Sequence, residues 1–406
     1  MGPMSTTAPT SRPLAAHGLL LLAVLGVAAN LRGVIASVPP LAGQIGADLG
    51  LGSGWVGALT ALPVLCMGVF APLAHRLAAR LGSATPISAG VLAIAVGSAL
   101  RAYGTHTWPL YAGTLLAGVG IAIAGTLLPG LVKHLFPPHR AGVVTGAYML
   151  AMMAAAGLAS AVSVPLADAL DSWALALAVW ALPALSGLLL WLPLSRRVHH
   201  TAPRVDADDE AAVTHRLPLR HATAVTLTAY LALQSWQFYS ALAWLAPTYV
   251  DHDWTRARAG YLLSVFTATQ MVAGFVAPAL ADRVRDRRLL LLPAVAFALA
   301  GELGVLLAPD AAPWVWSALL GLGQGAAFAL GLVLLVSYAA SPAASARLSA
   351  MGLGIGYAVA AFGPTVMGVV RDTSGGFRAV WLVLSVLLIV QVVVTTRLGP
   401  DLERVR

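Results

Sequence analysis

The chain has 406 residues, of which 59% are hydrophobic and 10% are charged. Soluble domains carry roughly 25% charged residues, so the composition excludes an ordinary soluble protein and indicates a chain that lies largely in a bilayer. The formal net charge of +8 does not indicate a nucleic-acid-binding protein, because the basic residues lie between apolar segments and not on one face.

Twelve apolar stretches follow one another along the chain, each long enough to cross ~30 Å of hydrocarbon as a helix. The first follows Arg12 and contains Asn30 and Arg32 with no obvious cleavage site, so it is expected to be an uncleaved helix and not a signal peptide. The stretches lie near 17–38, 54–74, 84–104, 109–132, 141–166, 173–194, 222–247, 257–280, 288–308, 312–338, 346–370 and 377–397.

The single long hydrophilic stretch separates the sixth apolar segment from the seventh and runs from Ser195 to about Arg220. It is predicted to be a solvated linker. The expected fold is therefore an all-α membrane protein of twelve transmembrane helices, with an N-terminal six-helix half (1–194), a cytoplasmic linker (195–220) and a C-terminal six-helix half (221–406).

The distribution of basic residues predicts the orientation. If the N-terminus is cytoplasmic, 18 of the 24 Lys and Arg residues fall on the cytoplasmic side, 5 fall on the opposite side, and Arg32 lies within a helix. Both termini are therefore expected in the cytoplasm, with the protein in a bacterial inner membrane.

The two halves also resemble each other, which is typical of transporters built from repeats. The segments "LAHR" (73–76) and "LADR" (280–283) follow the second helix of each half, and "LLAGVG" (115–120) and "LLGLG" (319–323) lie in the fourth. Cys66, the one cysteine, lies in an apolar run and is interpreted as a packing residue, since a single thiol forms no disulfide or cysteine metal site within one chain.

The loops after helices 2 and 8 resemble the signature loop of the major facilitator superfamily, with Asp282 and Arg283 matching its core. The first copy keeps Arg76 and Arg80 but has His75 in place of the acid. Within that superfamily the chain resembles the cyanate permease and 2-nitroimidazole transporter family, through "ANLRG" (29–33), "LLPGLVKHLFP" (127–137), "LQSWQFYSALAWLAP" (233–247) and "GLGQGAAFALGL" (321–332).

This resemblance implies a major facilitator fold and alternating access, in which the two halves rock about a central site. It also implies that Asp282, Arg283, Arg76 and Arg80 form an intracellular gate. Gly33 departs from the family pattern, in which Pro often follows "NLR", and this leaves the identity of the substrate open.

Arg32 is the first candidate for substrate binding, because an ionisable group inside a membrane is a functional candidate by default and a guanidinium matches a planar anion. Its alternative role is capping the carbonyls of a broken helix. Asn30 is a second candidate, but on a regular helix the two side chains point about 200° apart. Either the helix is irregular, as Gly33 and the pair Pro39-Pro40 would allow, or one residue is structural.

Further polar residues at bilayer depth are candidates to line a substrate cavity or, alternatively, to join helices by hydrogen bonds. Gln234 and Gln237 lie three apart and therefore on one helix face, near Tyr239. Gln324 and Tyr148 are weaker candidates. The glycines around Gln324 are expected to allow close helix packing and not to bind phosphate, since no strand precedes them.

Two other ionisable residues lie within the apolar segments. Arg101 is close to the end of helix 3, where its side chain is expected to reach the headgroups. Glu302 lies about 9 Å from the outer end of helix 9. The resemblance places that helix outside the cavity, so Glu302 is interpreted as structural, with proton coupling as the alternative.

Other chemistries lack their residue patterns. The ten histidines lie in loops or at helix ends, so no metal pair at helical spacing and no intramembrane histidine relay is expected, and the spans carry no catalytic cluster. The predicted function is that of a monomeric secondary transporter for a small anionic solute, without a cofactor and with the proton as a candidate coupling ion. Proton-coupled efflux of a drug-like or nitroaromatic compound and a non-transporting membrane sensor are the alternatives.

Overall fold

The computed structural model describes residues 14–104, 106–199, 217–281 and 283–405. The first half contains α1 (Leu14–Ala36), η1 (Pro39–Leu41), α2 (Ala42–Leu49), α3 (Ser53–Leu81), α4 (Ala84–Leu100), η2 (Arg101–Tyr103), α5 (Thr107–Leu135), α6 (Pro138–Ala169), α7 (Trp173–Ala178) and α8 (Ala181–His199). The second half contains α10 (Ala222–Asp251), α11 (Arg256–Ala281), α12 (Arg288–Leu307), α13 (Pro313–Ser337), α14 (Pro342–Ala360), α15 (Phe362–Ser374) and α16 (Phe377–Thr396).

These helices confirm the predicted twelve-helix membrane protein. Eleven segments of the described chain are long and apolar enough to cross a bilayer. The twelfth crossing is α10, a helix of 30 residues that carries the polar side chains of Gln234 and Gln237. Three crossings are each made of two consecutive helices separated by a break. These are α1 and α2, α7 and α8, and α14 and α15.

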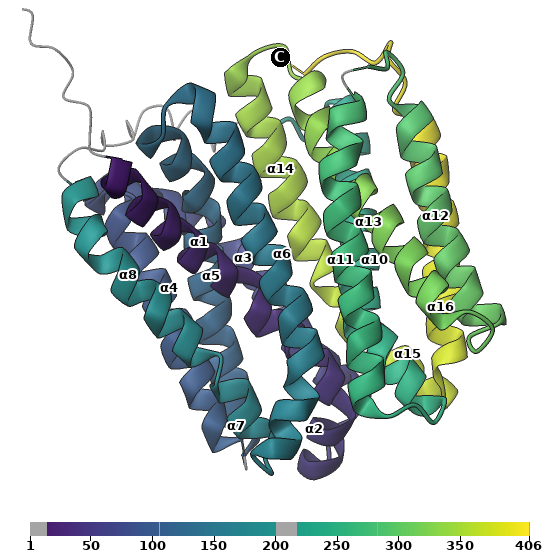
Figure 1. Cartoon of the computed structure of the whole chain (residues 1–406). Helices are drawn as coiled ribbons and strands as arrows, with labels where there is room; N and C mark the ends of the chain where they lie inside the picture. Colours follow the sequence, from purple (N-terminus) through teal and green to yellow (C-terminus); the bar gives the residue numbers. More distant parts are fainter. Residues whose placement is uncertain (1–13, 105, 200–216, 282, 406) are drawn as a thin grey trace, which may run out of the picture.

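The two ends of the bundle can be told apart by the chain termini. Figure 1 shows the C-terminus at one end, where α1 also begins, and α2, α7 and α15 at the other. We call the first the terminal end and the second the distal end. In Figure 1 the helices of the first half stand beside those of the second half, and α6 packs against α11 while α3 packs against α14 and α15.

Within each half, glycines bring the third and fourth crossings into close contact. A Cβ on Gly90 would lie 2.9 Å from the carbonyl oxygen of Gly120, where α4 packs on α5. In the second half, a Cβ on Gly301 would lie 2.8 Å from the backbone nitrogen of Leu320, where α12 packs on α13. The glycines beside Gln324 likewise lie against backbone atoms of α11 and α12, as expected for close helix packing.

Candidate functional site

The geometry around Arg32 joins the two halves of the molecule. Arg32 lies on α1, and its Nη1 donates a hydrogen bond of 2.7 Å to the hydroxyl of Tyr239 on α10. Tyr357 on α14 lies near this pair and interacts electrostatically with the guanidinium. Among the described residues, no carboxylate forms an ion pair with Arg32, and its hydrogen-bond acceptor there is the hydroxyl of Tyr239.

Aromatic rings surround this guanidinium. Its Cζ lies 5.7 Å from the ring centroid of Phe238 and 5.5 Å from that of Tyr239. The Phe238 ring stacks on Phe266 of α11 at 5.8 Å, and the rings of Tyr239 and Tyr357 meet edge to face at 6.3 Å. Cation–π contacts of this kind favour a positive charge in a partly dehydrated position.

A small pocket opens beside Arg32. Met153 of α6, Phe238 of α10, and Thr267 and Gln270 of α11 line it together with Arg32. With Tyr357 of α14, the site thus draws on the first and fifth crossings of one half, and on the first, second and fifth crossings of the other. A site between equivalent helices of two repeats is the arrangement expected of a transporter built from repeats.

The structure does not bring Asn30 into this site. The helix α1 is unbroken from Leu14 to Ala36, so the irregular geometry that would turn both side chains to one face is not present. Asn30 is 3% exposed, and its Nδ2 donates to the carbonyl oxygens of Gly26 at 2.7 Å and of Pro183 on α8 at 3.2 Å. It therefore joins α1 to α8, on the side of the helix away from Arg32.

The glutamines of α10 and α13 are also engaged by neighbouring helices. Gln234 donates to Oε1 of Gln324 at 3.1 Å, so these two candidates contact each other between α10 and α13. Gln237 is fully buried and donates to the carbonyl oxygen of Leu384 on α16 at 2.7 Å. Tyr148 of α6 is buried in the main apolar core. Of the predicted binding residues, the structure brings Arg32 and Tyr239 together beside the pocket, and Gln234 and Gln324 together between α10 and α13.

The side chain of Arg101 was predicted to reach the headgroups, and this prediction is wrong. It is fully buried, and its Nη1 donates to the carbonyl oxygen of Val34 at 3.2 Å. That carbonyl lies in the last turn of α1, where no residue further along the helix can bond it, and Ser37 Oγ also donates to it at 3.1 Å. The carbonyl-capping role weighed for Arg32 thus belongs to Arg101.

The predicted gate lies at the terminal end. Asp282 is outside the described residues, and Arg283, Arg76 and Arg80 are exposed. A set of contacts that was not predicted lies at the opposite end, and we call these the distal contacts. There the backbone N–H of Gly54 donates to Asp372 Oδ2 at 3.2 Å.

Three further distal contacts join the same halves along another line. Arg256 of α11 donates to Oε1 of Gln44 on α2 at 2.7 Å and lies 4.0 Å from Asp168 of α6. Ser264 Oγ donates to the carbonyl oxygen of Gly157 at 2.8 Å. The distal contacts therefore hold the halves together along two lines, α3 against α15 and α6 against α11.

Glu302 is fully buried on α12, and neither carboxylate oxygen has a hydrogen-bond partner among the described residues. Because a buried unpaired charge costs several kcal/mol, we expect the neutral acid. Glu302→Gln, which keeps shape and neutrality, should change the free energy of unfolding by less than about 1.5 kcal/mol. Glu302→Ala should cost about 2–5 kcal/mol by leaving a cavity.

Unfolding of the purified variants, followed by near-UV circular dichroism, measures both effects. A Gln variant as unstable as the Ala variant would contradict the structural role. A stable Gln variant that transports but no longer responds to a proton gradient would instead favour proton coupling.

Comparisons with known proteins agree with this architecture. Residues 20–250 and 227–405 match the family described as the Major Facilitator Superfamily. The chain is 32% identical to the 2-nitroimidazole transporter of Escherichia coli (strain K12) over 385 residues, which cover 95% of this chain and 96% of that protein. It is 31% identical over 382 residues to the cyanate transport protein CynX of the same organism, covering 94% and 97%. The uncharacterized transporter YycB of Bacillus subtilis (strain 168) is 34% identical over 389 residues, covering 95% and 94%.

Solved structures are similar in fold at low sequence identity. The nucleoside transporter NupG superposes with a TM-score of 0.75 at 14% identity, covering 94% of this chain and 99% of that one. A D-xylose-proton symporter gives 0.69 at 16% identity, covering 94% and 97%. These similarities show the fold, and a shared fold does not determine the function.

Proposed function

The chain belongs to the major facilitator superfamily, and we propose that it is a secondary active transporter that moves a small anionic solute by alternating access. The observation that carries the anionic preference is the guanidinium of Arg32. It lies between the halves, hydrogen-bonded to Tyr239 and without a carboxylate partner in the described part of the chain.

An unpaired charge at this depth is costly unless an anion compensates it for part of the cycle. The guanidinium presents donors in a planar fork, which suits two acceptor atoms on one flat group. The rings of Phe238 and Tyr239 add apolar faces against which a flat solute can stack. The proposed substrate is therefore a small, flat or linear solute with a delocalised negative charge or strong acceptor atoms.

Both named relatives suit this chemistry. Cyanate is a small linear anion, and 2-nitroimidazole is a flat ring whose nitro oxygens accept hydrogen bonds. Because Arg32 and its aromatic neighbours could hold either compound, the two form the first panel to test.

Alternating access requires contacts that form in one conformation and break in another. The distal contacts of Asp372 and Arg256 connect the two halves through hydrogen bonds and a partly exposed ion pair. Such contacts are weak enough to exchange. We assign them the role of the distal gate, opposite the gate proposed for Arg283, Arg76 and Arg80, to which Asp282 would contribute.

Uptake into proteoliposomes tests the proposal. Purified protein should accumulate radiolabelled cyanate or 2-nitroimidazole faster than protein-free liposomes, and an imposed proton gradient should change the rate if the proton is coupled. Binding without uptake would favour the sensor, and movement of 2-nitroimidazole only against the direction of proton flow would favour efflux. Absence of both binding and transport for small anions as a class would contradict the anionic substrate.

The proposed orientation yields a separate prediction. Cys66 is buried, so the native chain offers a low background for thiol labelling. Ala311→Cys, in the exposed distal loop between α12 and α13, should react with a membrane-impermeant maleimide in intact cells. Asp208→Cys, in the proposed cytoplasmic linker, should react only after the cells are opened. The reverse pattern would invert the topology.

A further inference from the structure

A polar cavity of about 340 Å³ lies at the terminal end of the second half, outside the proposed transport site. Its charged lining consists of Arg285 and Arg287 from the α11–α12 loop and Arg404 from the chain after α16. Ser337 and Tyr338, at the end of α13, complete the polar wall. Among the described residues no acid lines it, so three positive charges face one cavity.

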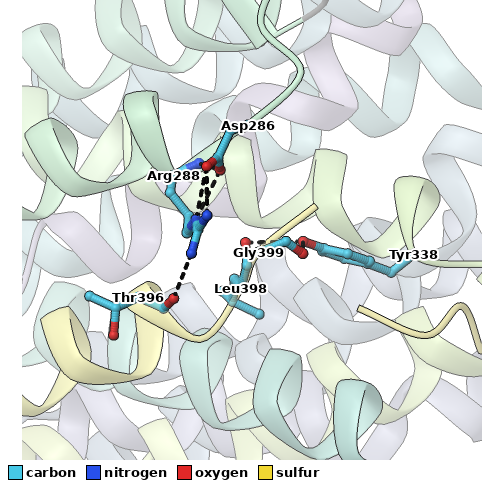
Figure 2. A network of polar contacts seen from close by, with 6 residues as sticks. All are labelled: Asp286, Arg288, Tyr338, Thr396, Leu398 and Gly399. Carbon is cyan, nitrogen blue, oxygen red and sulfur yellow. Dashed lines mark hydrogen bonds and ion pairs between the residues drawn. The ribbon is translucent and has the colours of Figure 1, made fainter. Parts of the chain in front are cut away.

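The wall formed by the C-terminal residues is held by a network of hydrogen bonds. Figure 2 shows Arg288 between Asp286 and Thr396, with Tyr338 beside the chain after α16. The Tyr338 hydroxyl donates to the carbonyl oxygens of Leu398 at 3.1 Å and Gly399 at 2.8 Å. Arg288 Nη1 donates to the carbonyl oxygen of Thr396 at 3.2 Å.

The same segment is tied again near its end. The backbone N–H of Val405 donates to the carbonyl oxygen of Tyr338, and that of Ala340 to Val405, both at 2.8 Å. Thr223 of α10 donates to the carbonyl oxygen of Glu403, also at 2.8 Å. Arg404 is therefore carried by a segment that is fixed on both sides, so the cavity has a defined shape.

The acid that lies between Arg285 and Arg287 in the sequence does not neutralise them. Asp286 is bonded by Arg288, whose Nε lies 3.0 Å from Oδ1 and whose Nη2 lies 2.7 Å from Oδ2. This hydrogen bonding lowers the pKa of the Asp286 carboxyl below its ordinary value, so it stays ionised and paired with Arg288 at neutral pH.

The cavity arginines themselves form no ion pair among the described residues. In addition, the Nε of Arg287 is buried and has no hydrogen-bond partner in the described part of the chain. Three like charges facing one space repel one another, and an unsatisfied buried donor adds to the cost. Both costs are relieved by an anion that accepts several hydrogen bonds.

We propose that this cavity binds a phosphate group. Guanidinium forks match phosphate oxygens in geometry and charge, and the volume is at the lower end of the range of small-molecule sites. Under the proposed topology the cavity faces the cytoplasm at the membrane surface, where both lipid headgroups and soluble phosphates occur. A bound phosphate would link the α11–α12 loop to the C-terminal segment without contact to the Arg32 site.

The experiment uses the purified full-length protein in two arms. In detergent, calorimetry with inorganic phosphate measures binding of free phosphate. In nanodiscs of phosphatidylglycerol or of phosphatidylcholine, native mass spectrometry measures retained phosphatidylglycerol. The test variants are the pair Arg285→Gln with Arg287→Gln, and Arg404→Gln alone, which alters only the C-terminal segment. The control is Arg397→Gln, which removes an exposed charge from the same end but not from the cavity.

The expected result is a loss of affinity of at least about 10-fold in both test variants and less than about 2-fold in the control. Loss in the inorganic phosphate arm assigns the site to a free phosphate, and loss of retained phosphatidylglycerol assigns it to a lipid headgroup. Wild-type binding in neither arm, or equal loss in the Arg397→Gln control, would overturn the proposal. Because Arg404→Gln changes no helix, its result stands if the double variant does not fold.

Discussion

Replacing Arg32 by lysine is expected to weaken binding of an anionic substrate by about 10- to 100-fold, although the charge is kept. The ammonium group loses the planar pair of donors that a guanidinium offers. A hydrogen bond to a charged group is worth roughly 1.5–3 kcal/mol, and about 1.4 kcal/mol corresponds to a factor of ten in affinity, so the loss of one bond gives this range. Isothermal calorimetry on purified protein measures it.

Tyr239→Phe is the matched control for this prediction. It removes the hydroxyl that accepts the 2.7 Å hydrogen bond from Arg32 but leaves the guanidinium and the aromatic ring in place. We expect a smaller change in affinity than for Arg32→Lys, because the anion replaces this hydroxyl as the acceptor. The contradicting result would come from the Arg32→Gln variant. If this variant is monodisperse and binds an identified anion as tightly as the wild type does, Arg32 does not bind the substrate charge.

The twelve-helix fold was predictable because bilayer thickness sets the length and apolarity of each crossing, and these are properties of the sequence alone. The first crossing was predicted to end at 38, whereas it turns at Pro39 and Pro40 and continues through α2 to Leu49. α10 shows the limit of hydropathy as a signal. It is a crossing whose polar side chains, Gln234 and Gln237, are buried against neighbouring helices, and this lowers its apolarity without removing it from the bundle.

Helical periodicity predicted which residues share a face, but not what that face contacts. Asn30 and Arg32 point apart, as expected for a regular helix, because α1 is unbroken from Leu14 to Ala36. Gln237 could not be assigned in the same way. Its partner is the backbone of Leu384, 147 positions later, and only the packing of α16 brings that carbonyl within reach.

Five basic residues lie on the side of the membrane opposite to the one where basic residues are common, and their position indicates a structural role that was not predicted. Arg101, Arg256 and Arg371 are three of the five that fall on the distal side. Arg101 caps α1, Arg256 connects the halves, and Arg371 lies 3.8 Å from Asp251. An arginine on the side of the membrane where arginine is rare could therefore have been predicted to contact another helix. The identity of its partner could not be predicted from the sequence.

Replacing Gly57 by alanine is expected to separate the two halves at the distal end. A Cβ at this position would overlap with the carbonyl oxygen of Pro364 in α15, which is backbone and cannot rotate away. Overpacking of this kind costs about 1–3 kcal/mol, and the cost falls only on the conformation in which α3 and α15 touch. The equilibrium should therefore move by about 5- to 150-fold toward the distal-open conformation.

The reporter for this shift is Met367→Cys on α15, which is 1% exposed in the closed arrangement, in a chain whose Cys66 is replaced by alanine. Gly57→Ala should raise its rate of reaction with a maleimide by at least about 5-fold. Gly43→Ala is the control, because that glycine also lies in a distal helix but has open space around its Cβ. Gly260→Ala tests the second line of distal contacts, since its Cβ would lie 2.6 Å from the carbonyl oxygen of Ser160. If Gly57→Ala and Gly260→Ala both fold and leave the reporter as unreactive as Gly43→Ala does, the distal contacts do not act as a gate.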